Sequence, residues 1–267
     1  MAIIYGLFNL SGSIKGYTFY KDKDGRNMMR KNPGPISDKI KNSPNYEVNR
    51  KYQKEFKGCI QFSALCRSAF GSFNQLSDYN FHNSLVKIGK NIMNMDTEFE
   101  VGKRRLKLTE HVNKLEGFDF CRKNYFDKLV RLHTNCKIDR ENLKAEINIE
   151  IQNWNFYLQN KFNFPFFRII LVIGCISNMI VNPITDDYEP FITDLQNAIE
   201  TLTGEWFTTK IAPPVHTMTI QLPEIWTKEI TDDVSLILSI AIEFGEEYNG
   251  QPEKANRGGS GKVLKIF

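Results

Sequence analysis

Few residues of this chain have the type and spacing that catalysis or metal binding requires. His133 and Cys136 lie three residues apart, but together they supply only two of the roughly four ligands of a structural zinc site. Two carboxylate clusters, at residues 186–189 and 232–233, fall in expected loops and lack the regular spacing of a calcium site. We interpret the clusters as solvated turn residues, with calcium ligation as the alternative, and predict neither a metal nor a cofactor.

The sequence also lacks the common enzyme signatures. It contains no G-x-G-x-x-G, G-x-S-x-G or H-E-x-x-H. Lys262 follows a glycine, but Asn256 and Val263 stand where a phosphate-binding loop needs glycine and a hydroxyl residue. We therefore predict a protein that is not an enzyme. An enzyme with an unfamiliar site is the alternative, and its first sign would be a deep pocket that gathers His, Cys or carboxylate side chains.

A basic segment, residues 26–67, interleaves Lys and Arg with aromatic residues, a composition that suits phosphate contacts and base stacking. The same composition suits an amphipathic helix with inward aromatics, and the helical spacing of the aromatics favours this second interpretation. Nucleic acid is thus an alternative partner. The basic patch consists of Arg26, Arg30, Lys31, Lys39, Lys41, Arg50, Lys51, Lys54 and Lys57.

Charge is distributed unevenly along the 267 residues, whose net charge is +4 and of which 41% are hydrophobic. Residues 1–107 hold 19 Lys and Arg against 9 Asp and Glu, whereas residues 108–267 hold 16 against 22. A basic half joined to an acidic half can attract copies of the chain head to tail.

Targeting and redox signals are sparse. No secretory signal begins the sequence, so we expect synthesis in the cytoplasm and leave the final location open, with a released particle or assembly as one destination. The longest apolar run, residues 166–181, is interrupted and too short for a transmembrane segment, and we expect a buried hairpin there. Five scattered cysteines, an odd number without a C-x-x-C pair, predict free thiols.

The first part of the chain predicts a small sheet followed by helices. Asp24-Gly25 between two strand-like runs is typical of a β-hairpin, and residues 32–35 form a break rich in Pro and Gly. A helix is expected from Tyr46 onward and a second one over about 79–95, with Leu85, Ile88, Ile92 and Met95 on its inner face. The expected core stripe of the first helix comprises Tyr46, Val48, Tyr52, Phe56, Ile60, Ala64 and Leu65.

The second part predicts an antiparallel β-sandwich. Residues 144–152 alternate strictly between apolar and polar side chains, and further strands are expected at 168–174, 177–182, 217–222, 236–244 and 262–267. Residues 246–261 are expected to be a flexible linker before the terminal strand. The predicted fold class is α+β, with a hairpin and basic helical region over 1–107 and a sandwich over 108–267.

The opening of the chain resembles a group of uncharacterised bacterial proteins. The resemblance rests on Gly12-Ser13-Ile14, Gly16 to Lys21, Asp24-Gly25, Arg30-Lys31 and Asn42-Ser43-Pro44, and it covers roughly residues 10–70. These proteins share a glycine-rich hairpin, a basic hinge and an N-x-P helix start. Such a hairpin followed by a helix also resembles the N-terminal region of some small phage structural proteins. The resemblance implies a role in assembly or surface structure and brings no catalytic residues.

Together these patterns predict a structural protein whose copies associate through the N-terminal hairpin and the basic helix, with the terminal strand as a further contact, by strand addition at exposed sheet edges. A nucleic-acid or envelope-associated protein that uses the basic patch is the alternative. Sugar binding by exposed Trp154, Trp206 or Trp226 is a further one, although buried tryptophans are expected. The residues assigned to assembly are Tyr17, Phe19, Tyr20, Lys262, Val263, Leu264, Ile266 and Phe267.

Overall fold

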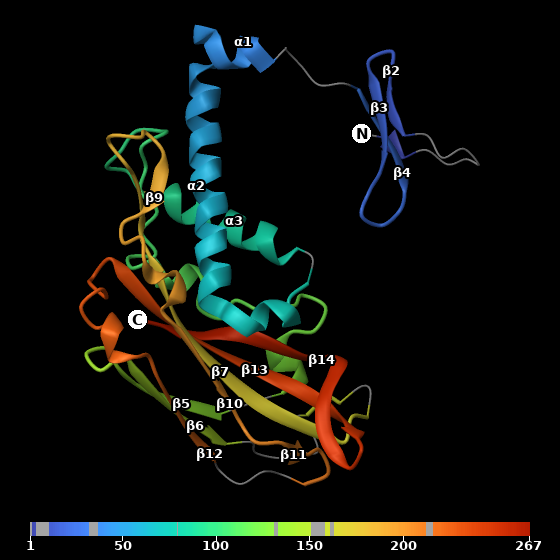
Figure 1. Ribbon diagram of the computed structural model, residues 1–267. Helices are drawn as coiled ribbons and strands as arrows, with labels where there is room; N and C mark the ends of the chain where they lie inside the picture. Colours follow the sequence, from blue (N-terminus) through green and yellow to red (C-terminus); the bar gives the residue numbers. More distant parts are fainter. Residues whose placement is uncertain are drawn as a thin grey trace. The chain divides into compact units, whose positions relative to one another are not determined.

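A computed structural model describes residues 2–3, 11–31, 37–78, 80–130, 133–150, 158–160, 163–211 and 216–267 (Figure 1). The chain divides into two compact units, Met1–Arg50 and Lys51–Phe267. The boundary that the sequence suggested, between residues 107 and 108, falls inside the second unit. The helices that follow residue 50 share one hydrophobic core with the strands of the large sheet, which explains why no division occurs there.

The first unit is an antiparallel sheet followed by short helices. Its strands, in the spatial order β1-β4-β3-β2, are β1 (Ala2–Ile3), β2 (Gly12–Ile14), β3 (Tyr17–Lys21) and β4 (Asn27–Lys31). Lys15 and Gly16, with φ of 46° and 81°, make the two-residue turn between β2 and β3, a conformation that favours glycine. The predicted N-terminal hairpin is confirmed, and Asp22 Oδ1 closes its Asp24-Gly25 turn by accepting backbone N–H groups of Asp24 and Arg26. The sheet is followed by α1 (Ser37–Asn42) and the 3-10 turn η1 (Pro44–Tyr46). The predicted break at 32–35 lies outside the described residues.

The second unit has three layers, with helices over a large sheet and a small sheet beneath it (Figure 1). Its helices and 3-10 turns are α2 (Glu47–Phe70, beginning in the first unit), η2 (Gly71–Leu76), α3 (Phe81–Met93), η3 (Val112–Lys114), α4 (Phe126–Leu129), η4 (Leu195–Asn197) and η5 (Glu224–Trp226). The large sheet contains β7 (Phe166–Ser177), β10 (Ile199–Thr203), β11 (Phe207–Thr208), β13 (Val234–Tyr248) and β14 (Gln251–Ile266). The small sheet contains β5 (His133–Asp139), β6 (Lys144–Glu150) and β12 (His216–Gln221), and β8 (Met179–Val181) pairs with β9 (Tyr188–Pro190). The α+β class is confirmed.

The central strands β7 and β13 are buried on both faces. Side chains such as Val172 and Ile237 pack into the helical core, whereas Leu171 and Leu238 pack into the core shared with the small sheet. A strand covered on both sides has no polar face, so its sequence is a continuous apolar run rather than an alternation. The hairpin expected over residues 166–181 is therefore wrong: β7 pairs with β10 and β13, and β8 pairs with β9.

Helix α2 buries a face that differs from the one that the sequence suggested. Cys59, Phe62 and Cys66 are buried, whereas Tyr52 and Phe56 are 47% and 54% exposed. Small residues on the buried face permit close packing: a Cβ added at Gly58 would lie 2.6 Å from Cγ of Tyr188. Of the expected core stripe from Tyr46 to Leu65, Leu65 packs against the core. The stripe is wrong for Val48, Tyr52, Phe56, Ile60 and Ala64, which are exposed, because the close approach to Tyr188 requires small side chains on the buried face.

The expected flexible linker at 246–261 is also wrong. Residues 251–261 belong to β14, which pairs with β13 along most of its length. Asn249 and Gly250, with φ of 50° and 77°, form the two-residue turn between the two strands. An Asn-Gly hairpin turn, rather than a polar linker, precedes the terminal strand.

Three of the five cysteines are buried, and burial lowers the reactivity of their thiols. Burial raises the pKa of Cys59 to about 11 and that of Cys175 to about 12, and it raises the pKa of Cys66 further. At pH 8 these thiols stay protonated, and the thiolate is the reactive form. We expect a thiol reagent at pH 8 to modify at most two cysteines, Cys121 and Cys136, in the native chain and all five in denaturant, measured by mass spectrometry. Native labelling of Cys66 would contradict the packing of α2.

Candidate interaction surfaces

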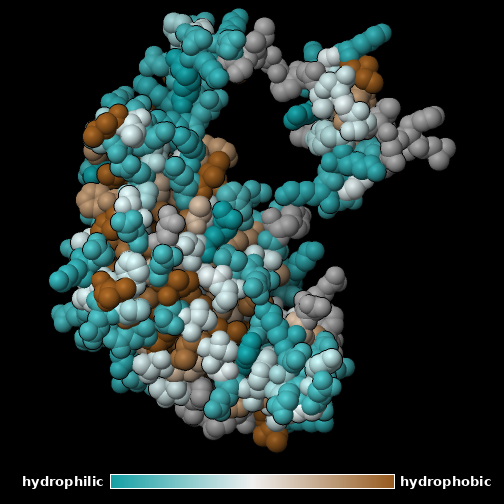
Figure 2. Space-filling model, viewed as in Figure 1, coloured by the Kyte–Doolittle hydropathy of each residue, from teal (hydrophilic) through white to brown (hydrophobic). Residues whose placement is uncertain are grey.

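Among its described side chains, the sheet of the first unit has no buried core. Within residues 11–31 and 38–50 no side chain is buried. Ile14 and Tyr17 are 55% and 41% exposed, and Figure 2 shows hydrophobic atoms at the surface of this sheet. A small sheet needs a covered apolar face for stability, so the exposed side chains constitute a surface suited to a partner.

Strand register divides the side chains of this sheet between two faces. One face, called here the lysine face, carries Ile14, Tyr17, Phe19, Lys21, Met29 and Lys31. The other carries Tyr20 and Arg30, whose guanidinium carbon lies 5.5 Å from the Tyr20 ring centroid, and Ser13, whose hydroxyl is hydrogen-bonded to that of Thr18. Tyr17 and Phe19 thus share a face, whereas Tyr20 lies on the opposite one.

The lysine face carries two lysines and no acidic residue. Residues 1–50 hold nine Lys and Arg against four Asp and Glu. Strands β2, β3 and β4 contain no acidic residue, and within the described part of this unit Lys21 and Lys31 have no ion-pair partner. An acidic or phosphate-bearing partner would supply the missing counter-charges.

The structure does not gather the basic patch into one surface. Lys51, Lys54 and Lys57 each form an ion pair within the second unit, with Glu100, Asp186 and Asp187 respectively. Arg26 pairs with Asp22 and Asp24 in its own turn. Arg50 donates hydrogen bonds to the carbonyls of Ile40 and Ser43. Lys31, Lys39 and Lys41 are exposed, as Lys21 is, so the exposed members of the patch for which the described residues supply no ion pair lie in the first unit.

The terminal strand is engaged within its own chain. Val263 and Ile266 are buried in the helical core, whereas Leu264 and Phe267 pack against the other core. One edge of β14 pairs with β13, and the backbone of residues 117–120 is hydrogen-bonded to the other edge at Gly261 and Val263. Lys262 forms an ion pair with Asp127. This part of the predicted assembly surface is therefore an internal element.

Beyond the end of β7, strands β13 and β14 continue as a two-stranded ribbon, residues 246–253. The last residue of β13 that pairs with β7 is Gly245, which lies opposite Phe166. Glu246, Glu247, Tyr248 and Glu253 are all exposed on this ribbon. Sequence reasoning missed it, although the Asn249-Gly250 turn was the available signal.

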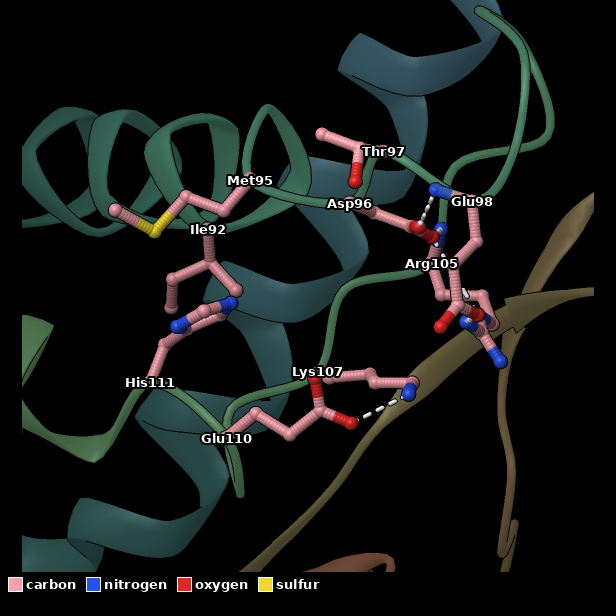
Figure 3. A pocket seen from close by; sticks show the side chains of 9 residues that line it. All are labelled: Ile92, Met95, Asp96, Thr97, Glu98, Arg105, Lys107, Glu110 and His111. Carbon is pink, nitrogen blue, oxygen red and sulfur yellow. Dashed lines mark hydrogen bonds and ion pairs between the residues drawn. The ribbon is translucent and has the colours of Figure 1, made fainter.

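Two hollows in the second unit adjoin Arg105. The first, of about 170 Å³, gathers His111 and three carboxylates (Figure 3). Asp96 Oδ2 accepts the backbone N–H of Arg105 at 2.6 Å, the Arg105 side chain pairs with Glu98, and Lys107 pairs with Glu110. Burial raises the pKa of Asp96, but the backbone N–H groups of Arg105 and Glu98 together with the Arg105 side chain outweigh burial and hold this pKa below its ordinary value. The charges of this hollow thus compensate one another.

The second hollow, of about 420 Å³, is more apolar. Phe99, Ile180, Val181 and Pro183 line it together with Lys103, Arg105 and Asp186. The Arg105 guanidinium carbon lies 4.5 Å from the Phe99 ring centroid. The sequence left an unfamiliar active site as an alternative. These two hollows are where such a site would lie.

The other predicted sites are dispersed. Within the described ranges no three His, Cys, Asp or Glu side chains come together as metal ligands, and the His133 side chain lies outside what the structure describes. Asp186 and Asp187 pair with lysines of α2. Trp206 and Trp226 are half-buried, and Trp154 lies outside the described residues. Among the helices that the structure describes, none has both the length and the apolar character to cross a membrane.

No family model, curated protein or solved structure matches the chain. The resemblance of residues 10–70 to bacterial and phage structural proteins therefore stays a prediction, and the function is argued from the surfaces alone.

Proposed function

We propose that this protein is a non-enzymatic structural component whose copies associate through the N-terminal sheet. One observation carries the proposal: Ile14 and Tyr17 are exposed and Phe19 and Met29 half-buried, and no side chain of the sheet whose burial is described is buried. Association would cover this apolar surface and contribute roughly 25 cal/mol for each Å² removed from water. Lys21 and Lys31, at the margins of the face, would fix the orientation in which the partner copy binds.

The test is the mass of the full chain in solution, measured by light scattering after size exclusion over a range of concentrations and salt. We expect species heavier than the 31.0 kDa monomer that grow with concentration. The double variant Tyr17→Ser with Phe19→Ser should remain monomeric, because it removes the aromatic surface of the lysine face. Ile184→Ser, at a residue that is 92% exposed in the second unit, is the matched control and should associate like the native chain.

Two results would count against the proposal. A native chain that stays monomeric at all concentrations would overturn it, as would association that the double variant leaves unchanged. Far-UV circular dichroism of each variant shows whether the second unit keeps its fold. Adding a single-stranded oligonucleotide tests the alternative: salt-sensitive binding by the monomer, lost on Lys31→Glu and Lys39→Glu, would favour nucleic acid as the partner.

A further inference from the structure

The ribbon of residues 246–253 presents an unpaired strand surface. Gly245 is the last β13 residue paired with β7, so residues 246–248 have backbone partners only in β14 among the described strands. Residues 251–253 likewise pair only with β13. Within the part of the chain that the structure describes, both edges of the ribbon are therefore open, and an open edge is a template for another strand. Figure 1 shows β13 and β14 extending past the end of β7.

The register of the ribbon brings like charges together. Glu246 lies directly opposite Glu253, next to the pair of Tyr248 and Gln251 two residues further along the same face. Carboxylates that lie opposite each other on two strands destabilise the pairing, and a cation placed between them relieves the repulsion. Tyr248 is 60% exposed and adds apolar surface beside the two carboxylates.

The nearest lysine of the ribbon is already engaged elsewhere. Lys254 Nζ lies 2.7 Å from Glu243 Oε1, and it also donates a hydrogen bond to Gln75. Glu243, 2% exposed, is in turn bound by Arg168 at 2.5 Å. The base of the ribbon is therefore fixed, while within the described residues of this unit Glu246 and Glu253 have no ion-pair partner.

The lysine face of the first unit has the complementary chemistry. It carries Lys21 and Lys31 without acidic neighbours in its strands, and Tyr17 and Phe19 between them can cover Tyr248. We infer that the ribbon around Glu246, Tyr248 and Glu253 is the docking surface for the lysine face of a second copy of this chain. This inference rests on the proposed function and names the surface that receives the N-terminal sheet.

The occupant of the ribbon is a second copy of this chain, because the lysine face and the ribbon are two different surfaces with complementary charges that every copy carries. Docking between different surfaces of neighbouring copies is head to tail, which produces rings or open chains.

Charge reversal in the full chain tests the inference. A ribbon variant carries Glu246→Lys with Glu253→Lys, and a sheet variant carries Lys21→Glu with Lys31→Glu. All four side chains lie at the surface, so folding should be retained. We expect each variant alone to associate at least about tenfold more weakly than the native chain, because like charges then face each other. An equimolar mixture should recover association, because each new charge meets its opposite on the other variant.

The matched control is Glu224→Lys with Glu229→Lys, which makes the same change in net charge at two exposed carboxylates outside the ribbon. This control should associate like the native chain. If the ribbon variant also does so while Tyr17→Ser with Phe19→Ser is monomeric, the sheet associates through another surface and the inference is overturned, although the proposed function stands. A mixture that stays monomeric would overturn the inference as well. If all variants associate like the native chain, the proposed function itself fails.

Discussion

Replacing Gly174 with alanine should lower the free energy of unfolding by about 2 kcal/mol or more, since overpacking a tight core typically costs 1–3 kcal/mol. Gly174 lies in β7 and approaches Ala69 near the end of α2. A Cβ at this position would lie 2.3 Å from the carbonyl oxygen of Ala69 and 2.9 Å from its Cα. Both atoms belong to the helix backbone, so no side-chain rotation can relieve the contact.

Neither partner of this contact can move easily. Gly174 pairs with Ile199 on one side and with Ile237 on the other, and Phe70, next to Ala69, is fully buried. Urea denaturation followed by circular dichroism measures the effect. Thr201→Ala, at an exposed position of the adjacent strand β10, is the control and should change stability by less than about 0.5 kcal/mol. Equal stability of Gly174→Ala and the control would refute the close approach of α2 to β7.

Replacing Glu55 with alanine should cost about 3 kcal/mol or more, because it leaves a cation without its buried partner. The Glu55 side chain is 0% exposed, Lys90 Nζ lies 2.5 Å from its Oε2, and Oε1 accepts the backbone N–H of Gly102 at 2.9 Å. This carboxylate therefore joins α2, α3 and the segment after α3. The loss would appear in the same denaturation measurement.

A double substitution separates the charge from the packing. Glu55→Met with Lys90→Met removes both charges and keeps apolar volume, so it should recover much of the stability lost in Glu55→Ala. Glu100→Gln is the control: Glu100 is 59% exposed and pairs with Lys51 and Lys103 at the surface, where solvent screens such pairs and they contribute little to stability. A loss in Glu55→Ala no larger than that in Glu100→Gln would contradict the role of the buried pair.

The sequence predicted elements well where one face is solvated. The alternation from Lys144 onward corresponds to β6, whose apolar side chains are buried, and the Asp24-Gly25 turn corresponds to the hairpin of β3 and β4. The sequence-based predictions failed where a strand is buried on both faces and where a helix approaches its neighbours closely. β7 has no polar face, and α2 turns small residues such as Gly58 to the core while Phe56 faces solvent.

The candidate surfaces were only partly predictable for a similar reason. Tyr17 and Phe19 were identifiable as apolar hairpin residues, but their lack of cover depends on what the rest of the chain does. The opposition of Glu246 and Glu253 depends on strand register, which the Asn249-Gly250 turn fixes and which a linker interpretation conceals. The pairing of Lys51, Lys54 and Lys57 with carboxylates far along the chain has no local sequence signal at all.

The placement of β13 and β14 in the middle of the fold has a consequence for the order in which the chain can fold on the ribosome. Helix α2, complete at Phe70, buries its inner face against side chains that include Val263 and Ile266. At about 5–20 residues per second, translation needs about 10 to 40 s to reach those residues from Phe70. During that interval the apolar strand β7 emerges without its central partner. Chaperones that hold exposed apolar strands should therefore influence the yield of this protein more than its final stability.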